Sequence, residues 1–132
     1  MIWRRRLRWG NFWWACDWLL AAGVVIGSLI PPSELDAMVP TVNDKIMHCG
    51  AYFLLGIWFA GSMEPRNHRW LAIVLIAMGG AIEILQYYMG FGRDADWRDF
   101  VANSIGVLVA LALARAGLGN WMAWVERRLI RG

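Results

Sequence analysis

The sequence predicts an all-α integral membrane protein, a four-helix bundle followed by a short C-terminal interfacial helix, in one domain covering residues 1–132. Composition is the first indication, because 59% of the 132 residues are hydrophobic and 17% are charged. A soluble domain of this size leaves much of its surface in water and could not hide so many apolar side chains. The second indication is that the apolar residues form four stretches, each of about the 20 residues that a helix needs to cross a bilayer.

We predict membrane spans at residues 12–30, 44–63, 70–89 and 99–116, and an interfacial tail at residues 120–131. Pro31 and Pro32 stop the first span, and a polar, basic turn over residues 64–69 separates the second span from the third. Gly117 and Gly119 break the helix after the fourth span. The tail mixes tryptophan and aliphatic residues with arginines, which is typical of a helix that lies along a membrane surface.

The basic residues predict the orientation of these spans. Ten of the thirteen lysines and arginines, counting Arg115, lie at the N-terminus, in the basic turn or near the C-terminus. Because positively charged segments stay on the cytoplasmic side, we expect both termini in the cytoplasm. The clusters flank membrane segments, so we interpret them as topology signals, and we expect membrane lipids and not nucleic acid as partners.

The second predicted span carries ionisable residues at its outer end. Asp44 begins it, and one stripe of the helix then holds Lys45, His48, Tyr52 and Gly56. Charged groups in hydrocarbon cost roughly 2.5–3.5 kcal/mol each at a helix centre on insertion scales, and they usually line a functional or paired site inside the protein. We therefore expect this stripe to face other polar groups.

The third and fourth spans bring further polar residues to the same outer end. Glu83 and Gln86 lie within the third span, and Asp99 and Asn103 share a face of the fourth, which Gly106 continues. Hydrogen bonds that merely hold the helices together are the simpler interpretation, at about 0.6 kcal/mol each. The bases, acids and amides at this one end exceed what packing requires, so we favour a functional site.

Four motif pieces occur in a fixed order from the second span to the fourth, over about half of the chain. They are Asp44-Lys45-x-x-His48, Tyr52 with Gly56, Glu83-x-x-Gln86, and Arg93-x(5)-Asp99-x(3)-Asn103-x-x-Gly106. This pattern resembles the VanZ-like family of small bacterial membrane proteins, apart from Ala110, where many members have a second glycine. The resemblance implies a multi-span protein of the bacterial cytoplasmic membrane and adds Arg93 to the site. The founding member is associated with teicoplanin resistance, which makes an effect on glycopeptide susceptibility one hypothesis for this chain.

The first hypothesis for the site is recognition or handling of an anionic cell-envelope component, such as a lipid-linked cell-wall intermediate or a phospholipid head group. Lys45, Arg93 and protonated His48 would hold a phosphate through charge-assisted hydrogen bonds. The predicted ligand-binding residues are Asp44, Lys45, Gln86, Arg93, Asp99 and Asn103.

Two alternatives stay open. The chain could be an intramembrane enzyme acting on such a lipid, with His48 and Glu83 as an acid–base pair. It could instead be a small regulatory subunit whose polar cluster is completed by another membrane protein. We predict no metal site, because the set of His48, Glu83 and Asp99 contains a single histidine. Nothing in the sequence indicates a cofactor.

Overall fold

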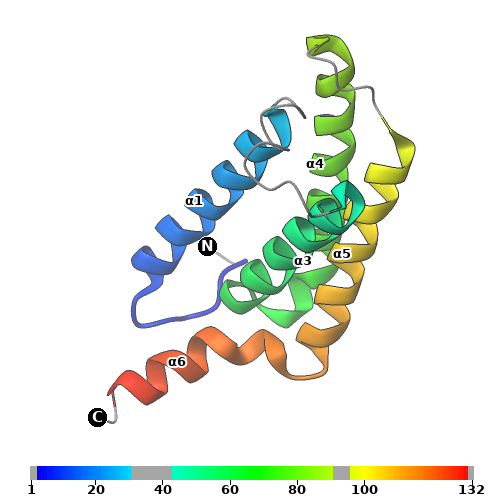
Figure 1. Cartoon of the computed structure of the whole chain (residues 1–132). Helices are drawn as coiled ribbons and strands as arrows, with labels where there is room; N and C mark the ends of the chain where they lie inside the picture. The colour runs from blue at the N-terminus through cyan, green and yellow to red at the C-terminus, as the bar shows by residue number, and fades with distance from the viewer. Residues whose placement is uncertain (1–2, 31–42, 91–95, 131–132) are drawn as a thin grey trace.

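Figure 1 shows the computed structural model of the chain, which describes residues 3–30, 43–90 and 96–130. Within these ranges the regular elements are helices, and the β-type pairing consists of an isolated bridge between Arg4 and Met63. In chain order the elements are α1 (Gly10–Leu29), α3 (Asp44–Ser62), η1 (Pro65–Asn67), α4 (His68–Met89), α5 (Trp97–Arg115), η2 (Leu118–Asn120) and α6 (Trp121–Ile130). The all-α prediction is confirmed, and each stretch predicted to span the membrane coincides with a helix to within two residues at either end.

Three helical segments in the described part of the chain are long and apolar enough to cross a membrane, namely α1, Pro65–Met89 and α5. α3 is 19 residues long but is not among them, and the polar residues Asp44, Lys45 and His48 lie at its start. The structure therefore supports a membrane protein with three apolar helices. A bundle of four membrane-spanning helices is a finer statement than these three helices support.

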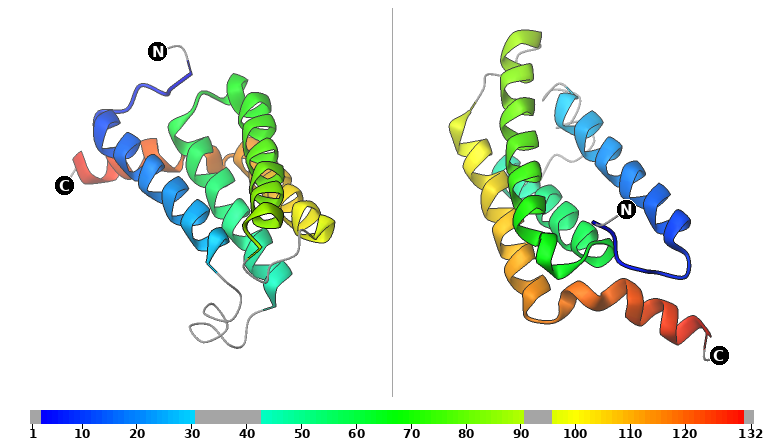
Figure 2. Two further views of the ribbon diagram at one scale, coloured as in Figure 1. Left: turned by 90° about the horizontal axis from the view of Figure 1, so that it is seen from above. Right: turned by 180° about the vertical axis from the view of Figure 1, so that it is seen from behind.

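α3 lies at the centre of the helical bundle, with α4 and α5 on one side and α1 on the other, as Figures 1 and 2 show. The hydrophobic core joins Tyr52 and Leu55 of α3 to Leu71 of α4 and to Val107 and Leu111 of α5. Every one of these side chains is at most 5% exposed. The best-packed part of the molecule is thus the group of α3, α4 and α5.

Glycine allows α3 and α5 to approach each other closely. A Cβ atom placed on Gly56 would lie 2.7 Å from Cβ of Ala110, and one placed on Gly106 would lie 2.9 Å from the backbone nitrogen of Phe53 and closer still to the carbonyl oxygen of Cys49. The two helices therefore meet nearly backbone to backbone, as small residues permit in membrane helices. This contact fixes which face of α3 is presented to α5.

α1 packs against the other helices less closely. Its buried side chains are Trp13 and Asp17, and both lie in its first half. Further along, a Cβ atom placed on Gly23 or Gly27 would meet no described atom within 4 Å. The second half of α1 therefore leaves space between itself and α3.

The N-terminal segment, the end of α3 and the start of α6 lie together at one end of the bundle. The backbone N–H of Arg5 donates to the carbonyl of Ser62 at 2.8 Å, and that of Glu64 donates to the carbonyl of Trp3 at 3.2 Å. Arg5 also donates from Nη1 to Oδ1 of Asn120 at 2.6 Å, immediately before α6. The starts of α3 and α5 lie at the opposite end, where the predicted polar residues are found (Figure 1).

Candidate functional site

Two capped helix starts place the first polar residues of the site. α3 begins after Asn43, whose Oδ1 accepts a hydrogen bond from the backbone N–H of Lys45 at 2.9 Å. α5 begins after Asp96, whose Oδ1 accepts from the backbone N–H of Arg98 at 2.9 Å. These side-chain oxygens satisfy backbone donors that the first turn of a helix leaves without partners. The caps therefore define where each helix begins and which residues occupy its first turn.

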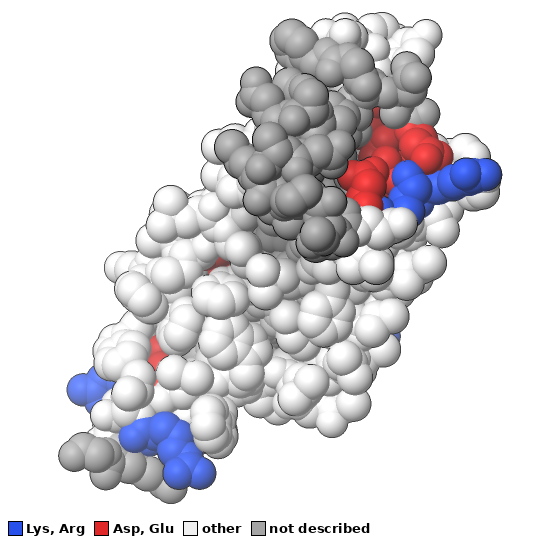
Figure 3. All heavy atoms as spheres, in the orientation of Figure 1, with Lys and Arg blue, Asp and Glu red and all other residues white. Residues whose placement is uncertain are grey.

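Lys45 bridges the two helix starts. Its Nζ donates to Oδ2 of Asp96 at 2.8 Å and to Oδ1 of Asp99, and it lies 3.8 Å from Oδ2 of Asp44. One ammonium group thus faces three carboxylates. We call these residues, with His48, the acidic cluster (Asp44, Lys45, His48, Asp96 and Asp99). Figure 3 shows acidic and basic side chains side by side near the start of α5.

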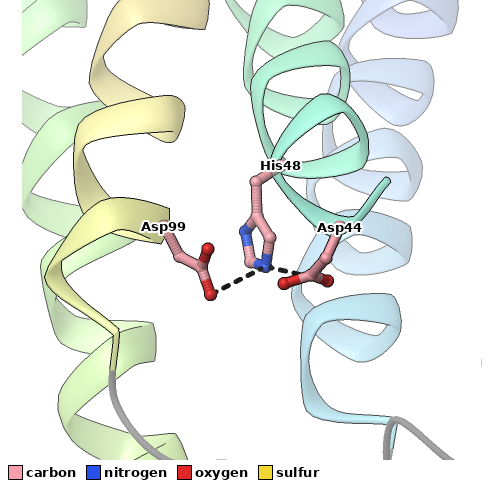
Figure 4. Close-up of side chains that lie close together, drawn as sticks. All are labelled: Asp44, His48 and Asp99. Atoms are coloured by element: carbon pink, nitrogen blue, oxygen red, sulfur yellow. Dashed lines mark ion pairs between the residues drawn. The ribbon is translucent and has the colours of Figure 1, made fainter. Parts of the chain in front are cut away.

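His48 is buried within the acidic cluster, with 6% of its surface exposed. Its Nδ1 lies 3.1 Å from Oδ1 of Asn103 on α5, and its Nε2 lies 3.7 Å from Oδ1 of Asp44 and 3.7 Å from Oδ2 of Asp99 (Figure 4). With the Asn103 oxygen as acceptor, Nδ1 is the donor in this contact, and Nε2 is the other ring nitrogen. Nε2 of His48 is therefore turned toward the two carboxylates.

Asp96 is a site residue that the sequence analysis does not include. The Lys45 ammonium, together with the backbone N–H of Arg98, holds the pKa of the Asp96 carboxyl below its usual value of 3.8. This carboxylate is therefore ionised at neutral pH. The sequence does hold a signal for it, because an aspartate just ahead of an apolar helix is a preferred capping residue.

Glu83 and Gln86 of α4 lie beside the acidic cluster. Glu83 is buried, and its Oε2 accepts a hydrogen bond from the backbone N–H of Asp96 at 3.3 Å. Gln86 donates from Nε2 to the carbonyl oxygen of Ser28 at 2.6 Å. Glu83 thus supports the start of α5, whereas Gln86 ties α4 to the end of α1.

The structure brings most of the predicted site residues together. Those in mutual contact are Asp44, Lys45, His48, Asp99 and Asn103. Glu83 joins the acidic cluster through the backbone of Asp96, and Gln86 bonds to α1. The carboxylates that lie 3.7 Å from the His48 ring are those of Asp44 and Asp99, and not the predicted partner Glu83. Arg93 lies outside the described residues.

A cavity of about 330 Å³ lies between α1 and α3 and reaches the acidic cluster. Asp44 and His48 line it at the cluster, and its remaining wall is largely aliphatic, from Leu19, Leu20, Val24, Met47 and Ala51. Apolar walls with a few convergent polar groups are the usual form of a ligand site. The loose packing of α1 therefore creates a space with one polar end.

A second cavity of about 720 Å³ lies between α4 and α5. Glu83 and Asp96 supply its acidic groups, and Tyr87, Trp97 and Phe100 supply aromatic ones. The acidic cluster thus has an apolar-walled cavity on either side, one toward α1 and one toward α4.

No protein-family model matches this chain, and no solved structure matches it significantly. What the site does is therefore inferred from its own residues and from the motif pattern.

Proposed function

We propose that this chain is a four-span protein of the bacterial cytoplasmic membrane that binds the head group of a cell-envelope lipid at the acidic cluster. The observation that supports this proposal best is the cavity between α1 and α3, whose aliphatic walls end at Asp44 and His48. A hydrocarbon chain would fill the apolar part, and burial contributes about 0.8 kcal/mol for each methylene group. The head group would hydrogen-bond to the polar end.

The charges around Lys45 restrict how an anionic head group could bind. Asp96 and Asp99 already contact the Lys45 ammonium, so a phosphate would have to compete with two carboxylates. Further positive charge would remove this competition. Arg93 is one source and a bound cation is another. We propose a lipid-linked cell-wall intermediate or a phospholipid as the ligand. Its binding at the acidic cluster requires this additional positive charge.

The four-span topology belongs to the same proposal. α3 is the long helix that its composition does not identify as a span, yet α1 on one side and the α4–α5 pair on the other cover much of its surface. The N-terminal segment, η1 and α6 lie together at the end opposite the acidic cluster. If the arginines of these segments are cytoplasmic, the acidic cluster faces the outer leaflet.

The motif residues support VanZ-like membership as a further part of the proposal. The same motif pieces that define the resemblance supply Lys45, His48, Asp99 and Asn103 to the site. An envelope lipid is the kind of ligand that this resemblance favours. The corresponding phenotype to measure is susceptibility to glycopeptide antibiotics.

Filling the cavity tests the proposal. Gly23→Leu places a side chain in the space between α1 and α3 without a clash, because no described atom lies within 4 Å of a Cβ at this position. Displacing about two methylene groups of ligand should reduce the bound lipid roughly tenfold. Bound lipid is measured by native mass spectrometry and by lipid analysis of the purified protein. Gly50→Leu on the exposed face of α3 is the matched control, since it also has no described neighbour within 4 Å and does not line the cavity.

A specific envelope lipid that is lost from the Gly23→Leu variant and kept by the Gly50→Leu variant is the expected result. The proposal fails if the lipid bound to the unaltered protein matches the bulk membrane composition, or if both variants retain it equally. Purification with one stoichiometric membrane protein in place of lipid would support the regulatory-subunit hypothesis instead.

An intramembrane enzyme is the second candidate, and the orientation of His48 favours it. Asn103 holds the ring through Nδ1, and His48 lines the polar end of the cavity together with Asp44, where a general base would meet a lipid head group. Covalent change of a bound lipid that is lost in His48→Gln and kept in Gly50→Leu, which lies outside the cavity, would establish this function. Unchanged lipid after prolonged incubation would exclude it in favour of binding alone.

A further inference from the structure

The carboxylates of Asp44 and Asp99 and the imidazole of His48 form a compact group of possible metal ligands (Figure 4). One ligand atom from each residue can be chosen so that all of them lie within 4.8 Å of one another. Nε2 of His48 lies 3.7 Å from each carboxylate, which is too long for a hydrogen bond. Ligand atoms around one ion, at bond lengths of about 2.0–2.2 Å, lie roughly 3.0–3.6 Å apart. We propose that these three residues bind a divalent transition-metal ion.

The environment of His48 is a second, independent observation that points to a metal. Ring nitrogens that bind metals usually belong to histidines whose other nitrogen donates to an oxygen, because this bond fixes the tautomer and the ring orientation. Asn103 provides that oxygen from the facing helix, 3.1 Å from Nδ1. His48 is buried, so its ring is held by packing as well. Nε2 is thereby directed at the two carboxylates before any ion binds.

The charge of the acidic cluster suits a divalent cation. Its formal charges are three negative carboxylates and one ammonium, a surplus of two negative charges when His48 is neutral. Lys45 contacts Oδ1 of Asp99, whereas Oδ2 of the same carboxylate faces His48. Glu83 adds a further acidic group next to Asp96. Lys45 and the proposed ion would thus occupy different sides of Asp99.

The donor set indicates the kind of ion. One imidazole nitrogen with two carboxylates suits Zn²⁺ or Mn²⁺, whereas Mg²⁺ and Ca²⁺ prefer sites made of oxygen alone. Three protein ligands also leave coordination positions for water or for a phosphate oxygen. The sequence alone groups His48 with Glu83 and Asp99, and it is the geometry that brings Asp44 in place of Glu83. The metal site does not require the proposed lipid function.

The test uses the untagged, full-length protein in detergent, after removal of metals with a chelator. Zn²⁺ alone is titrated by calorimetry, and Mn²⁺ alone is examined by electron spin-echo spectroscopy, which detects a nitrogen ligand. We expect one ion per chain and a ¹⁴N coupling from His48. His48→Gln should abolish the coupling because it removes the nitrogen ligand, and Asp44→Asn should weaken binding at least about tenfold because it replaces a charged carboxylate by a neutral amide. The Asp44 side chain is 47% exposed, so its variant should fold normally.

Asp96→Asn is the matched control. It makes the same change of charge at the same end of the bundle and still caps α5, but Asp96 is not one of the three ligands. A clearly smaller loss of Zn²⁺ affinity in this variant than in Asp44→Asn supports a coordinated ion. The proposal is overturned if Asp96→Asn weakens binding as much as Asp44→Asn, if the Mn²⁺ signal lacks a nitrogen coupling, or if no ion binds. Because the titration contains no envelope lipid and the Gly23→Leu experiment alters no ligand, failure of either proposal can be distinguished from failure of the other.

Discussion

The two ends of the bundle both bury carboxylates, but they surround them with different partners. At the end where the N-terminal segment meets α6, Glu126 is 6% exposed and accepts three hydrogen bonds. The donors are the backbone N–H groups of Arg8 and Trp9, each at 2.8 Å, and Nε1 of Trp13 at 2.9 Å. At the other end, three carboxylates share the ammonium of Lys45. One end is rich in donors and the other is rich in acceptors.

This difference separates a structural carboxylate from the proposed binding site. Burial by itself would raise the pKa of Glu126, but the N–H donors of Trp9, Arg8 and Trp13 and the charge of Arg8 outweigh burial, and the pKa lies below its ordinary value of 4.5. Glu126 is thus a satisfied anion that attaches α6 to the start of α1. The described residues of the acidic cluster, by contrast, place one ammonium group among three carboxylates.

Gly106→Val should have the largest effect, because it separates α3 from α5. The added side chain would meet backbone atoms of Cys49 and Phe53, which cannot rotate away as a side chain can. We expect the free energy of unfolding to fall by about 3 kcal/mol or more, at the upper end for overpacking. The measurement is reversible unfolding in mixed micelles. Zn²⁺ binding should be lost as well, since Asp99 and His48 would move apart.

Hydrogen exchange in the same variant tests whether the two ends of the bundle are independent. Hydrogen exchange at the amides of Arg8 and Trp9 reports on the Glu126 contacts, and we expect this protection to persist in a partly folded Gly106→Val chain. Gly50→Val in α3 is the control, because no described atom lies within 4 Å of a Cβ there. If Gly50→Val proves as destabilising as Gly106→Val, the loss of unfolding free energy reflects helix propensity and not the close contact of α3 with α5.

Lys45→Gln should have the next largest effect. Asp99, whose side chain is 7% exposed, would lose its cation, and the three carboxylates would repel one another. Removing one partner of a fully buried pair costs roughly 3–5 kcal/mol. Lys45 is 38% exposed, so solvent screening reduces the expected loss of unfolding free energy to about 2 kcal/mol. Adding Asp99→Asn to this variant should restore most of the stability.

Ligand binding by the Lys45→Gln variant distinguishes a metal ion from a phosphate at the acidic cluster. If the acidic cluster holds a metal ion, removal of the neighbouring ammonium should strengthen Zn²⁺ binding. If Lys45 instead contacts a phosphate directly, the variant should lose the lipid regardless of metal. Titration of the single variant with Zn²⁺ and with lipid vesicles in the presence and absence of a chelator separates these outcomes.

Helical periodicity explains why the sequence predicts so much of the acidic cluster. His48, Tyr52 and Gly56 form one buried face of α3, and Asp99 and Asn103 lie on a buried face of α5, as their spacing predicts. The small residues that continue these faces are what allow the faces to meet. Asp44 lies four residues before His48 on α3, so the spacing itself brings these two side chains together. The rotation of one helix relative to another is not contained in spacing, which is why the sequence favours Glu83 of α4 and the structure gives Asp99 of α5.

The hydrogen bonds of Glu126 cannot be predicted from the sequence, for a different reason. Its donors lie 113 to 118 residues earlier in the chain, and nothing in the local sequence distinguishes it from an exposed glutamate on an interfacial helix. α6 was correctly predicted as a helix, but its attachment to α1 depends on the tertiary fold. Long-range hydrogen bonds of this kind require the structure.

Glu126→Gln should have the smallest effect of the three substitutions, and its pH dependence is the informative part. The amide keeps one acceptor oxygen but turns its NH₂ group toward a backbone donor, so we expect a loss of about 1–2 kcal/mol in unfolding free energy at neutral pH. Because the pKa of Glu126 is lowered in the folded protein, its contribution is present above pH 4.5 and is lost as the pH falls through the lowered value. The difference in unfolding free energy between the unaltered protein and the Glu126→Gln variant, measured from pH 7 downward, should therefore shrink below pH 4.5. A difference that stays constant over this range would show that Glu126 acts by shape alone and would remove the contrast between the two ends of the bundle.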